Sequence, residues 1–354
     1  MKILHVVGTR PQYIKLFPLY RMMAESPDIE QKVYDTGQHF DYAMSGKLLE
    51  EFGIKNIDFG DIAGQKVGKQ LASMVGDVWQ YVEDYQPDYA VIYGDTNSTL
   101  AASIVCAKLQ VPYGHVEAGV RTDPSVGVQE GINRIVADHL ATNHYCVTQR
   151  DNDNLLKEGI CSTKIELVGD LMYDAFQRMA EDISFSNANN KNVLVTIHRS
   201  ENVDQDDNRL HLINLLAKLS ESYNLTLPLH PRFKHKMTSQ ERDIIANSNV
   251  NLVDPLSYKE MVQALKNSGA MITDSGGAPK DAAYAGIQSL VLRNDPLWHD
   301  LYDAGYIKTI DTITNLTVEF VLDFLATATT GNRVPYTQGL AAPVILKSIT
   351  EQCA

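Results

Sequence analysis

Three carboxylates stand at positions where α/β proteins carry out acid–base chemistry. Asp95 follows the apolar segment YAVIYG, and Glu117 lies near the end of YGHVEAG. Glu130 precedes Arg134 by four residues in QEGINRI, so on a helix the two side chains would share a face and could pair. Grouped at one edge of a sheet, such carboxylates can remove and return protons. Each alone has a structural alternative, because an Asp after a strand often caps the next helix.

Two histidines also follow apolar segments. His198 ends NVLVTIH and His230 ends LTLPLH. They stand on different expected strands without the spacing of metal ligands, and the HxE formed by His115 and Glu117 lacks the PCxxC partner of zinc deaminases. We therefore expect no metal site, and we count His198 and His230 among the candidates for work on an anionic substrate.

Two turns have the composition of anion sites, and the first is GTRPQYIK. Thr9 and Gln12 fit a capping box, while Arg10 and Lys15 add positive charge close to the free amides of a helix start. The alternative is a plain helix start with solvated charges. The turn is not GxGxxG, so no dinucleotide cofactor is indicated and we expect no cofactor.

The second turn is DSGGAP, which follows the apolar segment AMIT. Gly276 and Gly277 would let backbone amides approach a ligand closely, and Ser275 can cap the following helix or donate to a phosphate oxygen. A purely structural turn is the alternative. One such turn in each half of the chain suits a ligand that uses both.

Short apolar segments alternate with longer amphipathic ones, which predicts parallel sheets covered by helices. The expected strands are Lys2–Val7, Gln31–Thr36, Tyr89–Tyr93, Tyr113–Val116, His144–Val147, Ile165–Val168, Asn192–Thr196, Thr226–Pro228, Val250–Val253, Ala270–Thr273 and Ser289–Leu292. The expected helices are Ile14–Glu25, Lys69–Glu83, Thr99–Leu109, Asn208–Leu219, Tyr258–Asn267 and Pro279–Ala285. We predict an α/β fold of two doubly wound, Rossmann-like domains facing a central cleft.

The alternation pauses around Leu171–Asn190, where SFSNANNKN is polar and aperiodic. We therefore expect an N-terminal domain at 1–172 and a C-terminal domain at 173–341. A last helix is expected to join the N-terminal domain as residues 342–354.

Composition excludes several classes of function. The chain has 354 residues, too many for one core, and a formal net charge of −13, which opposes nonspecific binding to nucleic acid or to anionic membranes. Its four cysteines show no CxxC spacing, and we find neither a signal peptide nor an apolar stretch of about 20 residues. We expect a cytoplasmic protein.

Taken together and in this order, the motifs resemble those of the non-hydrolysing UDP-N-acetylglucosamine 2-epimerases from residue 2 to about residue 310. They are GTRPQYIK (8–15), TGQHFD (36–41), GDTNSTLA (94–101), HVEAGVR (115–121), QEGINR (129–134), TIHRSEN (196–202), LPLHPR (227–232) and TDSGG (273–277). The resemblance implies a glycosyltransferase-B-like fold with a UDP-binding C-terminal domain, a UDP-sugar as partner and a homodimer.

The resemblance also implies a reaction. UDP-N-acetylglucosamine and UDP-N-acetylmannosamine, a precursor in polysaccharide biosynthesis, would interconvert by elimination and re-addition of UDP through a 2-acetamidoglycal. Asp95, Glu117 and Glu130 would do the acid–base work, with His198 near the diphosphate and the sugar. Substrate or UDP contacts are implied for Arg10, Lys15, Gln38, His39, Arg134, His230, Ser275, Gly276, Gly277 and Asp281.

Some residues depart from the family pattern. Asp281 stands where a ribose-binding acidic residue is usual, and Trp298 replaces an active-site Arg. Several motifs are nearer to the branch that acts on UDP-2,3-diacetamido-2,3-dideoxyglucuronate, which is therefore an alternative substrate. A hydrolysing relative that releases free sugar and UDP, a glycosyltransferase of the same fold and a non-catalytic nucleotide-sugar sensor remain open.

Overall fold

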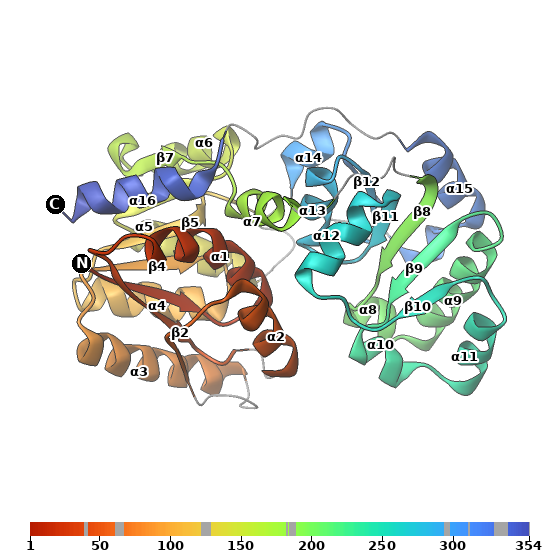
Figure 1. Cartoon of the computed structure of the whole chain (residues 1–354), viewed down its shortest axis with the longest axis horizontal. Coiled ribbons are helices and arrows are strands. Elements are labelled where there is room, and N and C mark those ends of the chain that lie inside the picture. The colour runs from red at the N-terminus through yellow and green to blue at the C-terminus, as the bar shows by residue number, and fades with distance from the viewer. Residues whose placement is uncertain are drawn as a thin grey trace. The chain divides into compact units, whose positions relative to one another are not determined.

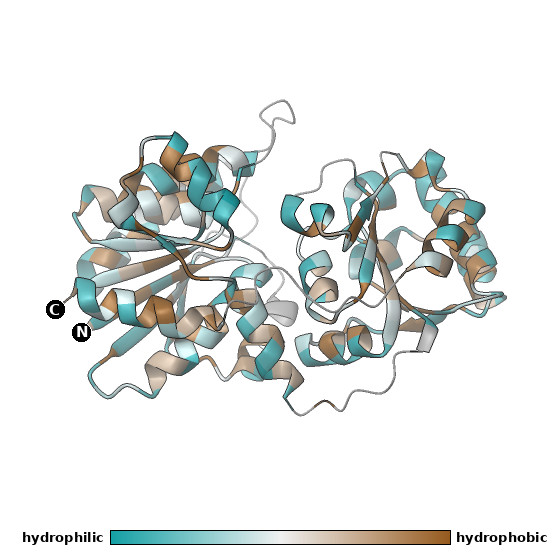
Figure 2. Ribbon diagram, turned by 90° about the horizontal axis from the view of Figure 1, so that it is seen from above, coloured by the Kyte–Doolittle hydropathy of each residue, from teal (hydrophilic) through white to brown (hydrophobic). Residues whose placement is uncertain are grey.

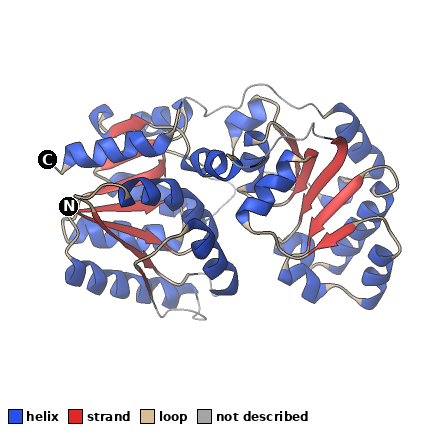
Figure 3. Ribbon diagram, in the orientation of Figure 1, coloured by secondary structure: helices blue, strands red, loops and turns tan. Residues whose placement is uncertain are grey.

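The computed structural model describes residues 1–38, 42–60, 67–121, 129–181, 183, 189–293, 298–310, 312–328 and 339–353. The chain divides into two compact units: unit 1 is Met1–Arg178 with Tyr336–Ala354, and unit 2 is Met179–Pro335. In each unit, helices lie on both faces of one parallel sheet (Figures 1 and 3). The predicted α/β fold with two doubly wound, Rossmann-like domains is confirmed.

Unit 1 contains a seven-stranded sheet in the order β3-β2-β1-β4-β5-β6-β7, with parallel pairing throughout. Its strands are β1 (Lys2–Val7), β2 (Glu30–Asp35), β3 (Ile57–Phe59), β4 (Tyr89–Tyr93), β5 (Tyr113–Ala118), β6 (Asn143–Cys146) and β7 (Ile165–Leu167). The helices of this part are α1 (Arg10–Ala24), α2 (Tyr42–Phe52), α3 (Val67–Tyr85), α4 (Asn97–Lys108), α5 (Gln129–Leu140), α6 (Gln149–Lys157), α7 (Leu171–Ala180) and α16 (Ala341–Gln352), with a 3-10 turn at η2 (Ser162–Lys164).

Unit 2 contains a six-stranded parallel sheet in the order β10-β9-β8-β11-β12-β13. Its strands are β8 (Asn189–Thr196), β9 (Asn224–Pro228), β10 (Asn251–Val253), β11 (Ser268–Thr273), β12 (Gln288–Val291) and β13 (Ile307–Thr309). Its helices are α8 (Ser200–Val203), α9 (Asp206–Leu219), α10 (Pro231–Lys236), α11 (Ser239–Ala246), α12 (Tyr258–Lys266), α13 (Ala278–Tyr284), α14 (His299–Asp303) and α15 (Val318–Thr327), with a 3-10 turn at η3 (Ile313–Asn315).

The strand order changes direction at one place in each sheet. In unit 1, β1 lies between β2 and β4, and in unit 2, β8 lies between β9 and β11. Doubly wound sheets bind ligands outside the carboxyl ends of the strands at such a switch point. A functional site is therefore expected at the turns after β1, β4, β8 and β11.

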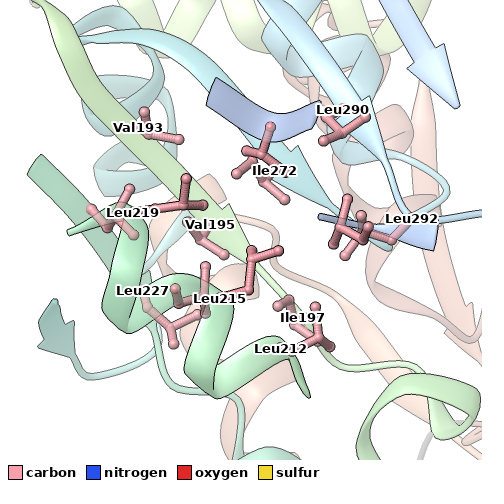
Figure 4. Close-up of a cluster of buried hydrophobic side chains, with 14 of the residues drawn as sticks. Val193, Val195, Ile197, Leu212, Leu215, Leu219, Leu227, Ile272, Leu290 and Leu292 are labelled. Carbon is pink, nitrogen blue, oxygen red and sulfur yellow. The ribbon is translucent and has the colours of Figure 1, made fainter. Parts of the chain in front are cut away.

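The core of unit 2 forms where α9 packs on the central strands (Figure 4). Alternate residues of β8 point to one face of the sheet, and α9 presents leucines at helical spacing to that face. The labelled members of this cluster are Val193, Val195, Ile197, Leu212, Leu215, Leu219, Leu227, Ile272, Leu290 and Leu292. Figure 2 shows helices that carry both hydrophilic and hydrophobic residues, as helices that cover a sheet do. None of the helices in the described part of the chain has the length and apolarity needed to cross a membrane.

All of the strands expected from the sequence are present, and the described residues contain two more that were missed. The missed strands, β3 and β13, have three residues each, and both contain exposed positions. A pause in the alternation of strands and helices was expected over Leu171–Asn190. For the first half of this segment the expectation is wrong, because α7 forms there. Asp170 starts this helix by accepting from the Met172 N–H at 2.9 Å.

Helix α16 packs within unit 1, against α1. Asp174 of α7 accepts from the N–H groups of Ala341 and Ala342 at 3.0 and 2.7 Å, which satisfies the first amides of α16. Tyr145 of β6 donates to Ser348 Oγ at 3.2 Å. Residues near the end of the chain therefore complete the packing of the first unit. The expected boundary between residues 172 and 173 lies inside α7.

Candidate active site

The turn after β1 packs closely because Gly8 has no side chain. A Cβ atom there would lie 2.2 Å from Ser98 Oγ and 2.4 Å from Thr36 Oγ1. Gln38 lies beside them, because its Oε1 accepts from the N–H (3.0 Å) and the hydroxyl (2.9 Å) of Ser98. The turns after β1 and β2 and the start of α4 therefore meet at this glycine. His39, the next predicted contact in the chain, lies outside the described residues.

At the helix start after β1, the side chain of Gln12 binds two backbone amides. Gln12 is buried, and its Oε1 accepts from the N–H groups of Gly8 (2.8 Å) and Thr9 (3.1 Å). Its Nε2 donates to the Tyr93 carbonyl at 2.7 Å, which ties the ends of β1 and β4 together. The predicted capping box is present. Arg10, the first residue of α1, is partly buried at this turn.

Lys15 faces a carboxylate. Its Nζ donates to Glu117 Oε2 at 2.6 Å, and the two side chains are only 7% and 2% exposed. Gly94 makes room for this pair: its φ is +65°, and a Cβ atom there would lie 3.4 Å from Lys15 Nζ. The sequence placed Lys15 beside a candidate anion site, and in the structure its partner is the Glu117 carboxylate.

Arg134 joins two of the predicted carboxylates. Its NH2 pairs with Asp95 Oδ2, and its NH1 lies 3.6 Å from Glu117 Oε2. The side chains of Arg134 and Glu117 are buried, whereas that of Asp95 is 27% exposed. Asn133 adds a hydrogen bond from its Nδ2 to the Asp95 carbonyl at 2.9 Å. With Lys15 these residues form two cations and two carboxylates at the carboxyl ends of β4 and β5, and we call the four ionised side chains the charged cluster.

Glu130 lies apart from the charged cluster. It is the second residue of α5, and it is exposed. Within the described ranges it makes no ion pair with Arg134, so the pair that their spacing would allow does not form. The physical reason is burial: a guanidinium inside the protein needs charged partners there, whereas an exposed pair four residues apart contributes only about 0.5 kcal/mol.

A second buried network supports the end of β5. His115 Nδ1 lies 2.6 Å from Asp138 Oδ1, and Asp138 Oδ2 accepts from the Gly119 N–H (3.1 Å) and from Arg121 NH1 (2.7 Å). Burial acts to raise the pKa of Asp138, but the His115 ring and the Arg121 guanidinium outweigh it and lower the pKa to about 2. Sequence reasoning missed Asp138, whose one signal is its place four residues after Arg134 in α5.

In unit 2, Asp274 organises the turn after β8. Its carboxylate is fully buried and accepts from the N–H groups of His198 (3.0 and 3.1 Å) and Arg199 (2.9 Å). Asn202 Nδ2 donates to it at 3.0 Å. This residue was not among the predicted site residues, although it opens the DSGG turn. Its carboxylate joins the turns after β8 and β11.

The two predicted histidines lie side by side. The ring of His198 is 38% exposed, its Nδ1 lies 3.2 Å from Asp274 Oδ1, and its centroid is 5.4 Å from that of His230. His230 caps α10, because its Nδ1 accepts from the Arg232 N–H at 3.2 Å. Among the described residues, no three His, Cys, Asp or Glu side chains are grouped so as to hold a metal ion.

The DSGG turn after β11 presents backbone amides. Ser275 Oγ accepts from the first N–H of α13 at 3.3 Å. The Gly276 carbonyl accepts from Trp298 Nε1 at 2.6 Å, and Lys280 Nζ lies 4.0 Å from the centroid of the indole. Within the described part of the chain, no hydrogen bond uses the N–H groups of Gly276 and Gly277. A ligand can therefore accept from both.

Asp281 lies in the same helix as Lys280 and is buried. Its Oδ1 accepts from the Tyr258 hydroxyl at 2.9 Å, a contact between α13 and α12. The Asp281 carboxylate is therefore held by the phenol of Tyr258.

Comparison with known proteins gives matches along most of the chain. The family model described as UDP-N-acetylglucosamine 2-epimerase matches residues 21–350. A Pseudomonas aeruginosa protein named UDP-2,3-diacetamido-2,3-dideoxy-D-glucuronate 2-epimerase is 33% identical over 327 residues, which cover 90% of this chain and 91% of that protein.

Solved structures agree with these matches. The UDP-GlcNAc 2-epimerase from Neisseria meningitidis, bound to UDP-GlcNAc, has a TM-score of 0.84 and 28% identity, and the match covers 99% of this chain and 100% of that one. The Methanocaldococcus jannaschii UDP-GlcNAc 2-epimerase, in complex with UDP-GlcNAc and UDP, has a TM-score of 0.83 and 27% identity with the same coverage. On the evidence of its fold, its motifs and these matches, the chain belongs to the UDP-N-acetylglucosamine 2-epimerase family.

Proposed function

We propose that the protein interconverts UDP-N-acetylglucosamine and UDP-N-acetylmannosamine without net hydrolysis. The observation that carries this proposal is the charged cluster of unit 1, in which two cations hold two carboxylates at the switch-point edge of the sheet. The family match and the complexes of the two structural relatives with UDP-GlcNAc support a UDP-sugar as the substrate.

The proposed reaction is an elimination followed by an addition. A carboxylate accepts the proton of carbon 2, the bond between carbon 1 and the diphosphate oxygen breaks, and its electron pair leaves with UDP. The product is a 2-acetamidoglycal. A proton then returns to carbon 2 on the opposite face while a UDP oxygen bonds to carbon 1. No electron is gained or lost overall and no water is consumed, so the reaction needs no redox cofactor.

Inversion by this route requires proton transfer on both faces of the sugar, and hence more than one group. Glu117 suits a base because it is a buried carboxylate at the carboxyl end of β5, held in place by Lys15 and Arg134. Asp95 is the more exposed carboxylate of the charged cluster and suits transfer on the other face. We keep Glu130 as a third acid–base candidate.

Unit 2 supplies the proposed site for UDP. The amides of Gly276 and Gly277 with the hydroxyl of Ser275 would bind the diphosphate, where negative charge develops as UDP departs. We propose that His198 contacts the same group and the sugar, with His230 beside it. Asp281 would accept from the ribose hydroxyls. In unit 1, we propose substrate contacts for Arg10, Gln38 and His39. Lys15 would contact either the substrate or its carboxylate partner Glu117.

A second candidate substrate is UDP-2,3-diacetamido-2,3-dideoxyglucuronate. The P. aeruginosa relative with that name is 33% identical to this chain. Trp298, which stands where the family usually has an Arg, bonds to the Gly276 carbonyl next to the proposed diphosphate site. A changed side chain there would alter which sugar the protein accepts.

One experiment tests both substrates and the mechanism. The protein is incubated with each UDP-sugar in deuterated water, and the products are followed by NMR. We expect the C2 epimer of the true substrate, with deuterium at carbon 2 of both epimers. Unlabelled epimers would contradict the elimination route, and stable free sugar with UDP would establish the hydrolysing alternative.

We further propose a cytoplasmic homodimer that supplies UDP-N-acetylmannosamine for polysaccharide biosynthesis. The free state of all four cysteines fits a reducing compartment. Ile132 and Ile135 of α5 are 64% and 44% exposed, and a second copy would cover such an apolar surface. Light scattering should give twice the mass of one chain for the wild type and less for Ile132→Lys. A monomeric wild type would contradict the dimer.

A further inference from the structure

The backbone of Glu117 adopts a conformation that residues other than glycine rarely adopt. Its φ is +67°, and the pairing of β5 with β6 shifts register between Val116 and Ala118, directly around it. A bulge of this kind turns a side chain out of the regular alternation of a strand. Left-handed backbone at a non-glycine residue costs free energy and persists only where the surroundings impose it. Something must therefore hold this turn.

One buried carboxylate bonds to the chain on both sides of Glu117. Asp138 Oδ1 lies 2.6 Å from His115 Nδ1, two residues before, and Asp138 Oδ2 accepts from the Gly119 N–H at 3.1 Å, two residues after. Arg121 NH1 donates to the same Oδ2 at 2.7 Å. The Asp138 side chain has no solvent exposure, so its whole hydrogen-bonding capacity is directed at the segment around Glu117.

The same network reaches the turn that carries the second carboxylate. The other ring nitrogen of His115, Nε2, lies 2.7 Å from the carbonyl of Gly94, the residue before Asp95. Gly94 itself has a φ of +65°. The Asp138 carboxylate therefore holds the end of β5 directly and the end of β4 through one imidazole.

Helix α5 thus contacts both the side chain of Glu117 and the backbone segment around it. Arg134 touches the carboxylates of Asp95 and Glu117, and Asp138, four residues later and on the same face of the helix, holds the backbone beneath them. We propose that Asp138 is a positioning residue for the proposed epimerisation: by bridging His115 and Gly119 it imposes the turn that aims Glu117 into the charged cluster. This inference rests on the proposed function.

The test compares Asp138→Asn with a matched control. Asn keeps the size of the side chain but offers an N–H₂ where His115 or Gly119 must donate. We expect kcat to fall about 100-fold, as small misplacements of reacting groups do. KM should stay within about threefold and the Kd for UDP within about twofold, because the proposed UDP contacts lie in unit 2. The control is Glu241→Gln, which changes a buried carboxylate that bonds Arg209 and the Thr238 N–H in unit 2. It should lower the melting temperature and leave kcat unchanged.

Amide hydrogen exchange gives a readout that needs no turnover. In Asp138→Asn the Gly119 amide should exchange at least about tenfold faster, while amides of β8 and β11 keep their wild-type rates. If the wild type turns over no UDP-sugar, the proposed function fails, and the exchange result still decides whether Asp138 holds the turn.

A second variant covers the case in which Asp138→Asn does not fold. His115→Gln removes one of the donors and leaves the Gly119 and Arg121 bonds in place, and we expect the same fall in kcat with little change in KM. The proposal is overturned if kcat of a folded variant stays within about threefold of wild type, or if kcat and UDP affinity fall together. It is also overturned if both variants fail to fold, because Asp138 would then act on stability alone.

Discussion

Lys15 Nζ lies 2.6 Å from Glu117 Oε2, and this contact joins the first helix of the chain to the end of β5, 102 residues later. Both side chains are buried, so each charge depends on the other for compensation. Arg134 NH1, at 3.6 Å from the same Glu117 oxygen, is a weaker substitute. The pair is therefore a test of how far unit 1 depends on the charged cluster.

We expect Lys15→Met to lower stability by about 3–5 kcal/mol, the usual cost of leaving one partner of a buried pair uncompensated. The control is Lys347→Met, which removes a pair with Glu351 whose side chains are 75% and 68% exposed and should cost less than about 0.5 kcal/mol. Urea unfolding of both variants measures the difference. Equal stabilities would show that the Lys15 pair is not a structural requirement.

Substitution by alanine should have opposite effects on stability at Gly8 and at Gly76. Gly8→Ala places a Cβ 2.2 Å from Ser98 Oγ, so the turn after β1 must shift, and we expect a loss of about 1–3 kcal/mol together with weaker substrate binding. Gly76 lies inside α3, and a Cβ added there would meet nothing within 4 Å, so Gly76→Ala should stabilise by up to about 1 kcal/mol. Thermal unfolding and KM distinguish the two. A neutral Gly8→Ala would mean that the turn tolerates displacement.

Trp298→Phe removes the indole N–H and keeps an aromatic ring over Lys280. Loss of the bond to the Gly276 carbonyl, worth about 1 kcal/mol net, should weaken UDP binding by up to about fivefold by loosening the proposed diphosphate turn. Trp79→Phe, in α3 of unit 1, is the control and should leave the Kd for UDP unchanged. Isothermal titration with UDP measures both. An unchanged Kd in Trp298→Phe would separate this contact from nucleotide binding.

His5 makes the stability of unit 1 sensitive to acid. Burial lowers the pKa of His5 from 6.5 to about 4, although the hydrogen bond with Gln31 raises it. Between these two values the unfolded chain binds more protons than the folded one, so stability falls as pH drops from 6.5 towards 4, by up to about 3 kcal/mol. Above pH 6.5 this contribution is fully present.

The two tryptophans allow a clean measurement, because Trp79 lies in unit 1 and Trp298 in unit 2. In a Trp298→Phe background, fluorescence reports on unit 1 during urea unfolding at a series of pH values. Replacing His5 with Gln should flatten the pH dependence between 6.5 and 4. The same slope with and without His5 would assign the acid sensitivity to other groups.

Much of the fold followed from sequence because buried parallel strands are continuous apolar runs, as in β4 and β11. Edge strands such as β3 lack that signal because they are partly exposed. The carboxylates were found because they follow such runs, but their partners were not predictable from local spacing. The spacing of Arg134 allowed a pair with Glu130 on its own helix, but Arg134 instead compensates charges that the fold brings from β4 and β5. Asp138 and Asp274 were missed for the same reason, since their partners are distant in sequence.

The position of α16 bears on the order in which the protein takes shape on the ribosome. Unit 2 is one continuous stretch, whereas unit 1 needs both the first 178 residues and the helix at Ala341–Gln352. Until that last helix emerges, Asp174 lacks the two amides it accepts from in the finished molecule. Unit 2, which is synthesised after most of unit 1, can therefore complete its core first. Unit 1 completes its core only after α16 has been synthesised.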